Sequence, residues 1–286
     1  MGITGEPTAQ QRERISELKL IIYDGFRRAV ADGAPADSCG VLVDEEFGTK
    51  IARSAGMEGL TLAMPVERSG QDEFDFEFGD AFGEHVEAFA PDFAKVLVRY
   101  NPDGDQRLNR RQEERLAQLS VWLHAHDRKF LFELLVPATP AQLEQVGGDQ
   151  DVYDRDLRPA LVVRTLAQMQ EAGVEPNIWK IEGLEAREDC ERVVAQAQVG
   201  GREDVRCVVL GRGADLERVA QWLKVAAPVD GYIGFAIGRT LWSDALSERL
   251  ADRLDRDAAT AQIAANYGQM IDTYAAAAVS RPVGAR

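Results

Sequence analysis

The chain has 286 residues, of which 45% are hydrophobic and 28% are charged, the balance of an ordinary globular protein long enough to bury a core. Its formal net charge of −15 argues against nucleic acid or an anionic membrane as a partner. No apolar run approaches the ~18 residues of a membrane helix, and the polar N-terminus lacks a signal-peptide segment. We therefore expect a cytoplasmic protein whose three cysteines are reduced.

Seven short apolar runs predict β-strands. Each run is rich in Val, Ile, Leu and Phe, which is typical of strands buried on both faces. In chain order the predicted strands are Cys39–Val43, Leu60–Met64, Phe93–Arg99, Phe130–Leu135, Asn177–Glu182, Val205–Leu210 and Gly231–Ala236.

Longer stretches with helical spacing of apolar residues lie around these runs. They predict helices over Glu13–Ala31, Gln106–Ala125, Asp154–Ala172, Asp215–Val225, Ser243–Arg253 and Asp257–Tyr274. The acidic, aromatic stretch Asp72–Asp80 is expected to form a surface hairpin or a packing loop. Strands that alternate with helices predict a parallel sheet with helical crossovers.

The spacing of the strands predicts an α/β fold, a TIM (β/α)8-type barrel of ~250 residues. A doubly wound open sheet is the rival, but the chain has no Gly-x-Gly-x-x-Gly turn after its first strand. Because the first predicted element is a helix, we expect the barrel to lack its first strand. We assign residues 1–280 to a single barrel domain and residues 281–286 to a disordered tail.

In such a barrel the carboxyl ends of the strands form the active site. Lys180 follows Trp179 inside an apolar strand, where burial lowers the pKa of an amine, and Lys95 nearby would act in the same direction. A neutral amine can attack a carbonyl carbon and form a Schiff base, with Glu133 transferring protons. The alternative is that Lys180 is only ion-paired to Glu133 or Glu182, and spacing alone leaves the two interpretations balanced.

Two glycine-containing loops at consecutive strand ends predict a phosphate site. One contains Gly211 and Arg212, and the other contains Gly238 and Arg239. Glycines let backbone N–H groups approach a phosphate, and arginine binds phosphate in bidentate fashion. Barrels often bind phosphate between these two loops. The alternative is that the glycines are ordinary turn residues and Arg212 is solvated.

The histidines do not predict a metal site. His124 and His126 lie near the end of a predicted helix, just before a strand, on the face of a barrel opposite its active site. A metal-dependent enzyme of this fold would need histidines at its strand ends. We therefore expect no metal and no other cofactor.

Five segments together resemble the class I tagatose-1,6-bisphosphate aldolase family. They are Val43–Gly48, Lys95–Asp103, Phe130–Glu133, Trp179–Glu182 and Gly234–Trp242. The chain is most similar to the aldolase-like domain that bacteria often fuse behind 5-dehydro-2-deoxygluconokinase, an enzyme of inositol catabolism. The resemblance covers nearly the whole chain.

The resemblance implies roles for individual residues. Lys180 matches the Schiff-base lysine, Glu133 the acid–base glutamate and Lys95 the neighbouring lysine. Gly238 and Arg239 match the phosphate-binding end of the last strand. The implied reaction is reversible, metal-independent aldol cleavage of a phosphorylated keto sugar or keto sugar acid, such as 2-deoxy-5-keto-gluconate 6-phosphate. The products would be dihydroxyacetone phosphate and an aldehyde.

Asp44, Glu182, Gly211 and Arg212 complete the predicted substrate-binding and phosphate-binding set. Family members begin with a strand that ends in Asp-His-Arg, and this chain opens after that point. A barrel without that strand has unpaired edges, so we expect a partner chain, a distorted closure or an inactive fragment. We also expect a homo-oligomer. The alternative function is a non-catalytic sugar-phosphate-binding module associated with a sugar kinase. An isomerase or epimerase on the same barrel is a third reading.

Overall fold

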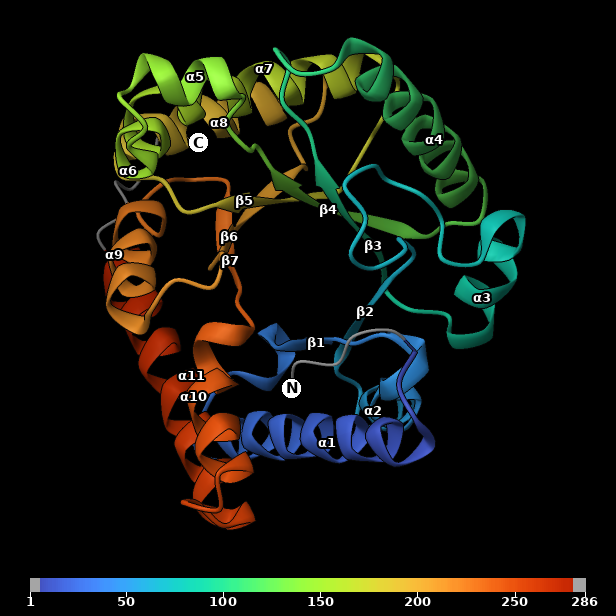
Figure 1. Cartoon of the computed structure of the whole chain (residues 1–286), viewed down its shortest axis with the longest axis vertical. Coiled ribbons are helices and arrows are strands. Elements are labelled where there is room, and N and C mark those ends of the chain that lie inside the picture. Colours follow the sequence, from blue (N-terminus) through green and yellow to red (C-terminus); the bar gives the residue numbers. More distant parts are fainter. Residues whose placement is uncertain (1–5, 280–286) are drawn as a thin grey trace.

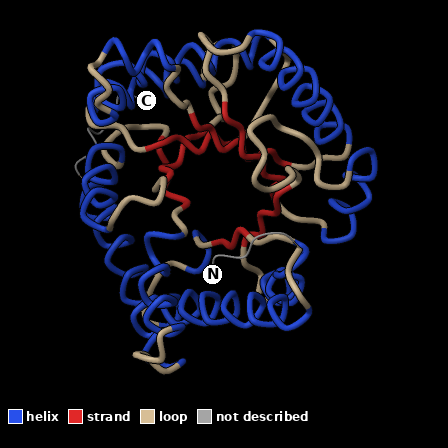
Figure 2. The backbone as a smooth tube through the Cα atoms, in the orientation of Figure 1, coloured by secondary structure: helices blue, strands red, loops and turns tan. Residues whose placement is uncertain are grey.

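Seven parallel strands curl into a ring at the centre of the structure (Figures 1 and 2). The computed structural model describes residues 6–279. Neighbouring strands pair in chain order, so the predicted α/β barrel-type fold is confirmed. The strands are β1 (Gly40–Leu42), β2 (Thr61–Pro65), β3 (Phe93–Arg99), β4 (Lys129–Leu135), β5 (Ile178–Glu182), β6 (Arg206–Leu210) and β7 (Tyr232–Ala236).

Helices surround the ring on its outer side (Figure 2). They are α1 (Ala9–Ala31), α2 (Glu45–Met57), α3 (Phe82–Phe89), α4 (Gln106–Ala125), α5 (Pro140–Gln145), α6 (Gln150–Val152), α7 (Arg158–Glu171), α8 (Arg187–Ala197), α9 (Leu216–Ala226), α10 (Arg239–Leu250) and α11 (Arg256–Ala278). Two 3₁₀ turns, η1 (Ala36–Ser38) and η2 (Gly79–Ala81), and a π-helical turn, η3 (Tyr153–Leu157), complete the described elements.

Each predicted strand is found with its ends within one residue of the predicted bounds. Helix α1 begins at Ala9, earlier than predicted, because Thr8 and Gln11 form a reciprocal capping box. The helix predicted to start at Asp154 begins as the π-helical turn η3 and continues as α7. The sequence does not predict helices α2, α3, α5, α6 and α8. The tail expected at residues 281–286 lies outside the described residues.

The ring is open between β1 and β7. Within residues 6–279 no strand pairs with the outer edge of either one. Helix α1 runs along this open side and packs against α11 and α2 (Figure 1). Over the same residues, no helix combines the length and the hydrophobicity needed to cross a membrane.

The alternation of side chains along β5 directs polar groups into the ring. Trp179 and Ile181 are fully buried in the main hydrophobic core, and Trp179 packs against Phe132 of β4 with ring centroids 4.8 Å apart. Because successive side chains of a strand point to opposite faces, Lys180 and Glu182 point away from that core. The packing of the outer face therefore fixes which residues line the interior of the ring.

Gly183, the residue after β5, is packed closely against a side chain, and we predict that any added side chain there destabilises the fold. A Cβ at Gly183 would lie 1.9 Å from Cδ2 of Trp222, whose indole donates to Glu185. We expect Gly183→Ala to destabilise the fold by ~1–3 kcal/mol, because the backbone or the indole must move. Gly56→Ala is the control: no atom lies within 4 Å of its added Cβ in α2. The free energy of unfolding of this control, measured by urea denaturation, should rise by ~0.5–1 kcal/mol. Equal stability of the two variants would contradict the packing described here.

Candidate active site

Four charged side chains of alternating sign form a chain inside the ring, here called the charge chain. Nζ of Lys180 lies 3.0 Å from Oε1 of Glu133, and Nζ of Lys95 lies 2.9 Å from Oε2 of the same carboxylate. Lys95 Nζ also lies 2.5 Å from Oε1 of Glu67. These side chains are only 7–11% exposed. The charge chain thus joins three neighbouring strands and the segment that follows β2 within a buried interior.

Strand register explains why three of these residues meet. Glu133 of β4 is the direct partner of Lys180 in β5. On the other side of β4, Glu133 is paired with Leu97, and Lys95 lies two residues before Leu97 on the same face of β3. The structure therefore brings together Lys95, Glu133 and Lys180, the three residues predicted from the sequence to be catalytic. It also shows that Lys180 does have the ion pair with Glu133 that formed the alternative interpretation.

The pKa values of the two lysines of the charge chain are shifted in opposite directions. Burial lowers the pKa of Lys180 below its ordinary value; Glu133 opposes this effect and the charge of Lys95 adds to it. Burial also acts to lower the pKa of Lys95, but the carboxylates of Glu67 and Glu133 outweigh it, and the pKa is raised. The pKa of Glu133 is lowered because its two lysine partners outweigh the effect of burial. Lys180 is therefore the amine that loses its proton more readily.

Glu67 is a member of the site that the sequence did not reveal. It follows β2 and forms an antiparallel bridge with Phe76, so a hairpin carries it over the ring. Burial raises the pKa of Glu67, opposed by Lys95. Its Oε2 is buried and has no hydrogen-bond partner within residues 6–279. Glu67 is thus a buried carboxylate with one oxygen that makes no hydrogen bond to the described residues.

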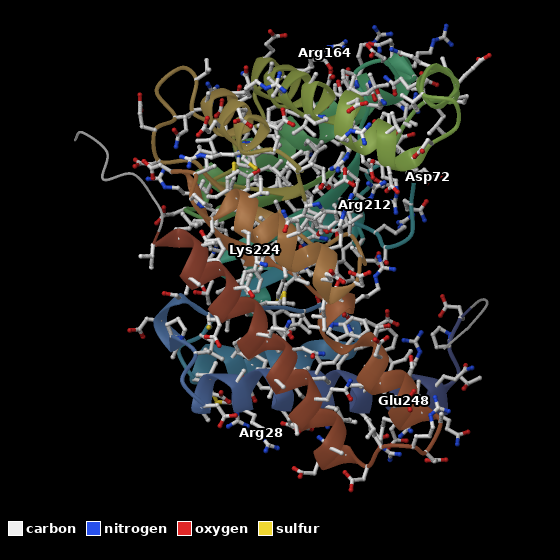
Figure 3. The ribbon with its side chains drawn as sticks, turned by 90° about the vertical axis from the view of Figure 1, so that its left-hand side faces the viewer. Arg28, Asp72, Arg164, Arg212, Lys224 and Glu248 are labelled. Carbon is white, nitrogen blue, oxygen red and sulfur yellow. The ribbon has the colours of Figure 1, made fainter. Side chains whose placement is uncertain are left out.

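Glu182 and Arg212 belong to a second ion cluster, separate from the charge chain. Nε of Arg212 lies 2.9 Å from Glu182, and its Nη1 lies 2.5 Å from Asp154. Arg158 contacts both carboxylates, at 3.6 Å and 3.2 Å. The backbone N–H of Val136 also donates to Glu182. In the side view of Figure 3, Arg212 lies toward the middle of the molecule. Its charge is therefore already paired with two carboxylates.

The two glycine loops lie side by side at the rim. A Cβ at Gly213 would lie 3.3 Å from Nη2 of Arg239, and one at Gly211 would lie 3.0 Å from Ile237. Gly238 is the N-cap of α10 and provides no side-chain cap, so the first N–H groups of this helix are open to an anion. Arg239 is exposed. The structure thus joins Gly211, Gly238 and Arg239 into one candidate phosphate site.

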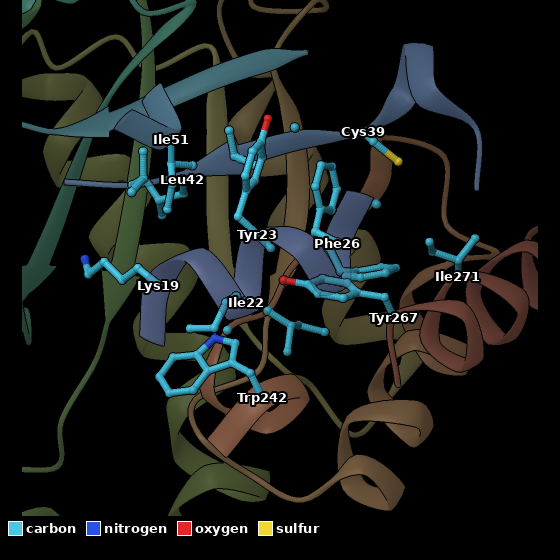
Figure 4. A pocket seen from close by; sticks show the side chains of 18 of the residues that line it. Lys19, Ile22, Tyr23, Phe26, Cys39, Leu42, Ile51, Trp242, Tyr267 and Ile271 are labelled. Atoms are coloured by element: carbon cyan, nitrogen blue, oxygen red, sulfur yellow. The ribbon is translucent and has the colours of Figure 1, made fainter. Parts of the chain in front are cut away.

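Asp44 and Lys180 occupy different settings. Asp44 caps α2 by accepting from the backbone N–H of Phe47, and it forms an ion pair with Lys19. Lys180 lines a cavity of about 1190 Å³ that extends to Gly238 at the rim and outward to α1. Figure 4 shows Lys19, Trp242 and the aromatic side chains of α1 around this cavity.

Over residues 6–279, no group of three or more His, Cys, Asp and Glu side chains is placed to hold a metal ion.

Residues 4–278 match a family described as "Uncharacterized protein conserved in bacteria (DUF2090)". The chain belongs to the DUF2090 family. No curated protein matches the sequence.

Two solved structures resemble this DUF2090 chain in fold. One is Cgl0159 from Corynebacterium glutamicum, with a TM-score of 0.59 and 18% identity over 94% of this chain and 80% of that chain. Another is fructose-bisphosphate aldolase from Plasmodium falciparum, with a TM-score of 0.58 and 14% identity over 98% of this chain and 90% of that chain. At these identities the likeness shows that the chain has an aldolase-like barrel fold.

The charge chain predicts that two substitutions move the titration of Lys180 in opposite directions. Lys95→Met removes a neighbouring cation, so the pKa of Lys180 should rise. Glu133→Gln removes the carboxylate that favours the ammonium form, so the pKa of Lys180 should fall. The rate of acylation of Lys180, followed by peptide mass spectrometry across pH, measures both shifts. Shifts in the same direction would contradict the geometry.

Proposed function

We propose that this DUF2090 chain is a class I, Schiff-base aldolase. Its substrate would be a phosphorylated keto sugar or keto sugar acid, cleaved to dihydroxyacetone phosphate and an aldehyde. The observation that carries the proposal is the buried Lys180, whose pKa is lowered by burial and which contacts Glu133 at 3.0 Å. The aldolase-like fold and the sequence resemblance support the same reaction, and the resemblance points to 2-deoxy-5-keto-gluconate 6-phosphate as the first substrate to test.

The first steps follow from the charge chain. The neutral amine of Lys180 adds to the ketone carbon, and a C–N bond forms as the carbonyl oxygen takes up a proton. Loss of that oxygen as water then gives a protonated Schiff base. While the nitrogen is neutral, Glu133 has lost one of the two cations that lower its pKa, so its pKa rises. Glu133 is then a better donor for the departing hydroxyl.

The Schiff base makes carbon–carbon cleavage possible because its positive charge accepts the electron pair of the breaking bond. A base must remove the proton of the substrate hydroxyl that becomes the aldehyde. Protonation of the resulting enamine and hydrolysis then release dihydroxyacetone phosphate and regenerate the amine of Lys180. Glu133 and the unpartnered Oε2 of Glu67 are the carboxylate groups of the charge chain suited to these proton transfers.

Trapping tests the covalent step. Incubation with dihydroxyacetone phosphate and borohydride should reduce the Schiff base and leave a stable adduct on Lys180, seen by peptide mass spectrometry. Lys180→Met should abolish the adduct, whereas Lys224→Met, which removes an exposed lysine of α9, should keep it. An adduct that persists in Lys180→Met overturns the proposal. Dihydroxyacetone phosphate could instead raise the Tm of both the unsubstituted protein and the Lys180→Met variant without forming any adduct. In that case the protein is a binding module and not an aldolase.

The phosphate end is tested independently. Arg239→Ala should weaken inorganic phosphate binding by about tenfold or more, because charge-assisted hydrogen bonds of ~1.5–3 kcal/mol are lost. Arg164→Ala, at an exposed ion pair with Asp103, is the matched control and should bind phosphate normally. Titration calorimetry measures both. Unchanged phosphate binding in Arg239→Ala would remove this residue from the site.

A further inference from the structure

Arg212 lies in a tight turn at the rim, between two glycines. The turn spans Gly211–Ala214, and its ends are joined by a hydrogen bond of 2.9 Å from the backbone N–H of Ala214 to the carbonyl oxygen of Gly211. Arg212 has a φ of +50°, a left-handed backbone that glycine adopts freely and that a residue with a side chain adopts at a cost. The chain thus places an arginine where glycine would suit the backbone, which indicates that the side chain has a role there.

The side chain of Arg212 is anchored to the body of the ring. Its Nε contacts Glu182 at 2.9 Å, and its Nη1 donates to Asp154 at 2.5 Å. The side chain of Glu182 is only 2% exposed. Asp154 lies on the π-helical turn η3, where the buried Tyr153 donates to the carbonyl oxygen of Val136 at 2.9 Å. Both carboxylates therefore belong to well-packed parts of the structure, and they fasten the turn to them.

Arg158 shows why Arg212 stays in the second ion cluster. Arg158 is 1% exposed and lies 3.2 Å and 3.6 Å from the same two carboxylates, but its Nε and Nη1 make no hydrogen bond to the described residues. With two guanidiniums for two carboxylates, the cluster is neutral only while Arg212 remains in it. If Arg212 moved onto a phosphate, a buried carboxylate would lose its partner, which is costly. The cluster therefore favours Arg212 as an anchor over Arg212 as a ligand.

The other end of the turn contacts Arg239 and Thr240. A Cβ at Gly213 would lie 3.3 Å from Nη2 of Arg239, so this guanidinium packs on the backbone of the glycine. The hydroxyl of Thr240 donates to the carbonyl oxygen of Ala214 at 2.6 Å. The exposed guanidinium of Arg239 is thus supported by the turn that Arg212 fastens.

We propose that Arg212 is a positioning residue for phosphate binding. It does not touch the phosphate; it holds the turn Gly211–Ala214 so that Arg239 presents its guanidinium to the phosphate of the substrate. The proposal rests on the proposed function, since it requires a phosphate at this rim. As a phosphate ligand, the role predicted from the sequence, Arg212 would have to leave Glu182 and Asp154. The two roles therefore predict opposite effects of removing one of these carboxylates.

Asp154→Ala tests the role without changing either arginine. By charge alone, the loss of a carboxylate near an anion site strengthens phosphate binding. We expect instead that inorganic phosphate binds about threefold or more weakly, because the turn loses an anchor. Asp156→Ala is the matched control: Asp156 lies on the same π-helical turn in an exposed ion pair with Arg155, so the affinity should stay within about twofold. Titration calorimetry measures both affinities. Unchanged or tighter binding in Asp154→Ala would overturn the proposal.

Arg212→Met separates positioning from damage to the fold. Borohydride trapping on Lys180 is compared for dihydroxyacetone phosphate and for dihydroxyacetone, which has no phosphate. For the same yield of adduct, the variant should need about threefold or more of the phosphorylated ketone and an unchanged concentration of the other. Arg187→Met, at an exposed ion pair with Glu191, is the control and should change neither concentration. Equal losses with both ketones would contradict a role at the phosphate end.

The proposed reaction and the positioning role can fail separately. If the unsubstituted protein forms no adduct with either ketone, the proposed reaction is wrong, and phosphate calorimetry on Asp154→Ala decides the role of Arg212. If the unsubstituted protein binds no inorganic phosphate, the positioning role is wrong even where Lys180 forms adducts.

Discussion

The charge chain is the interaction on which the interior of the ring depends. An isolated buried charge costs several kcal/mol, and alternation of sign over contacts of 2.5–3.0 Å offsets that cost. The alternation also fixes strand register: a slip of one residue in β4 would turn Glu133 toward the helices and leave two lysines facing each other. Lys95 has two carboxylate partners and Lys180 has one, so the structural requirement itself makes Lys180 the more reactive amine.

A chain with a net charge of −15 needs a local positive site to bind a phosphorylated substrate. Arg212 looks suited to this in the sequence, but the second ion cluster holds its guanidinium between Glu182 and Asp154 and its backbone at a φ of +50°. The pairing leaves exposed Arg239 and the start of α10 as the groups of the rim that we propose to bind the phosphate. Arg212 is better understood as the group that neutralises buried Glu182, which positions the loop on which Arg239 packs.

The sequence predicts the strands well because each apolar run is long enough for a buried strand and too short for a helix. It also predicts that Lys95, Glu133 and Lys180 lie together, since neighbouring parallel strands place side chains of the same face side by side. It fails for α2, whose acidic start at Asp44 resembles a strand end, and for other short helices. It also fails for Glu67, which is positioned by the bridge to Phe76 and by the stacking of Phe76 on Phe82 at 4.4 Å. Such contacts between side chains of a loop leave no periodic pattern.

The opening of the ring and the chemistry of Lys180 are physically linked, because one cavity contains both. Side chains of α1 line this cavity together with Lys180 and Gly238. Water that enters the cavity weakens the effects of burial and of Lys95 on the pKa of Lys180. A substrate that fills the cavity and excludes water would therefore strengthen both effects and favour the neutral amine that the proposed reaction requires.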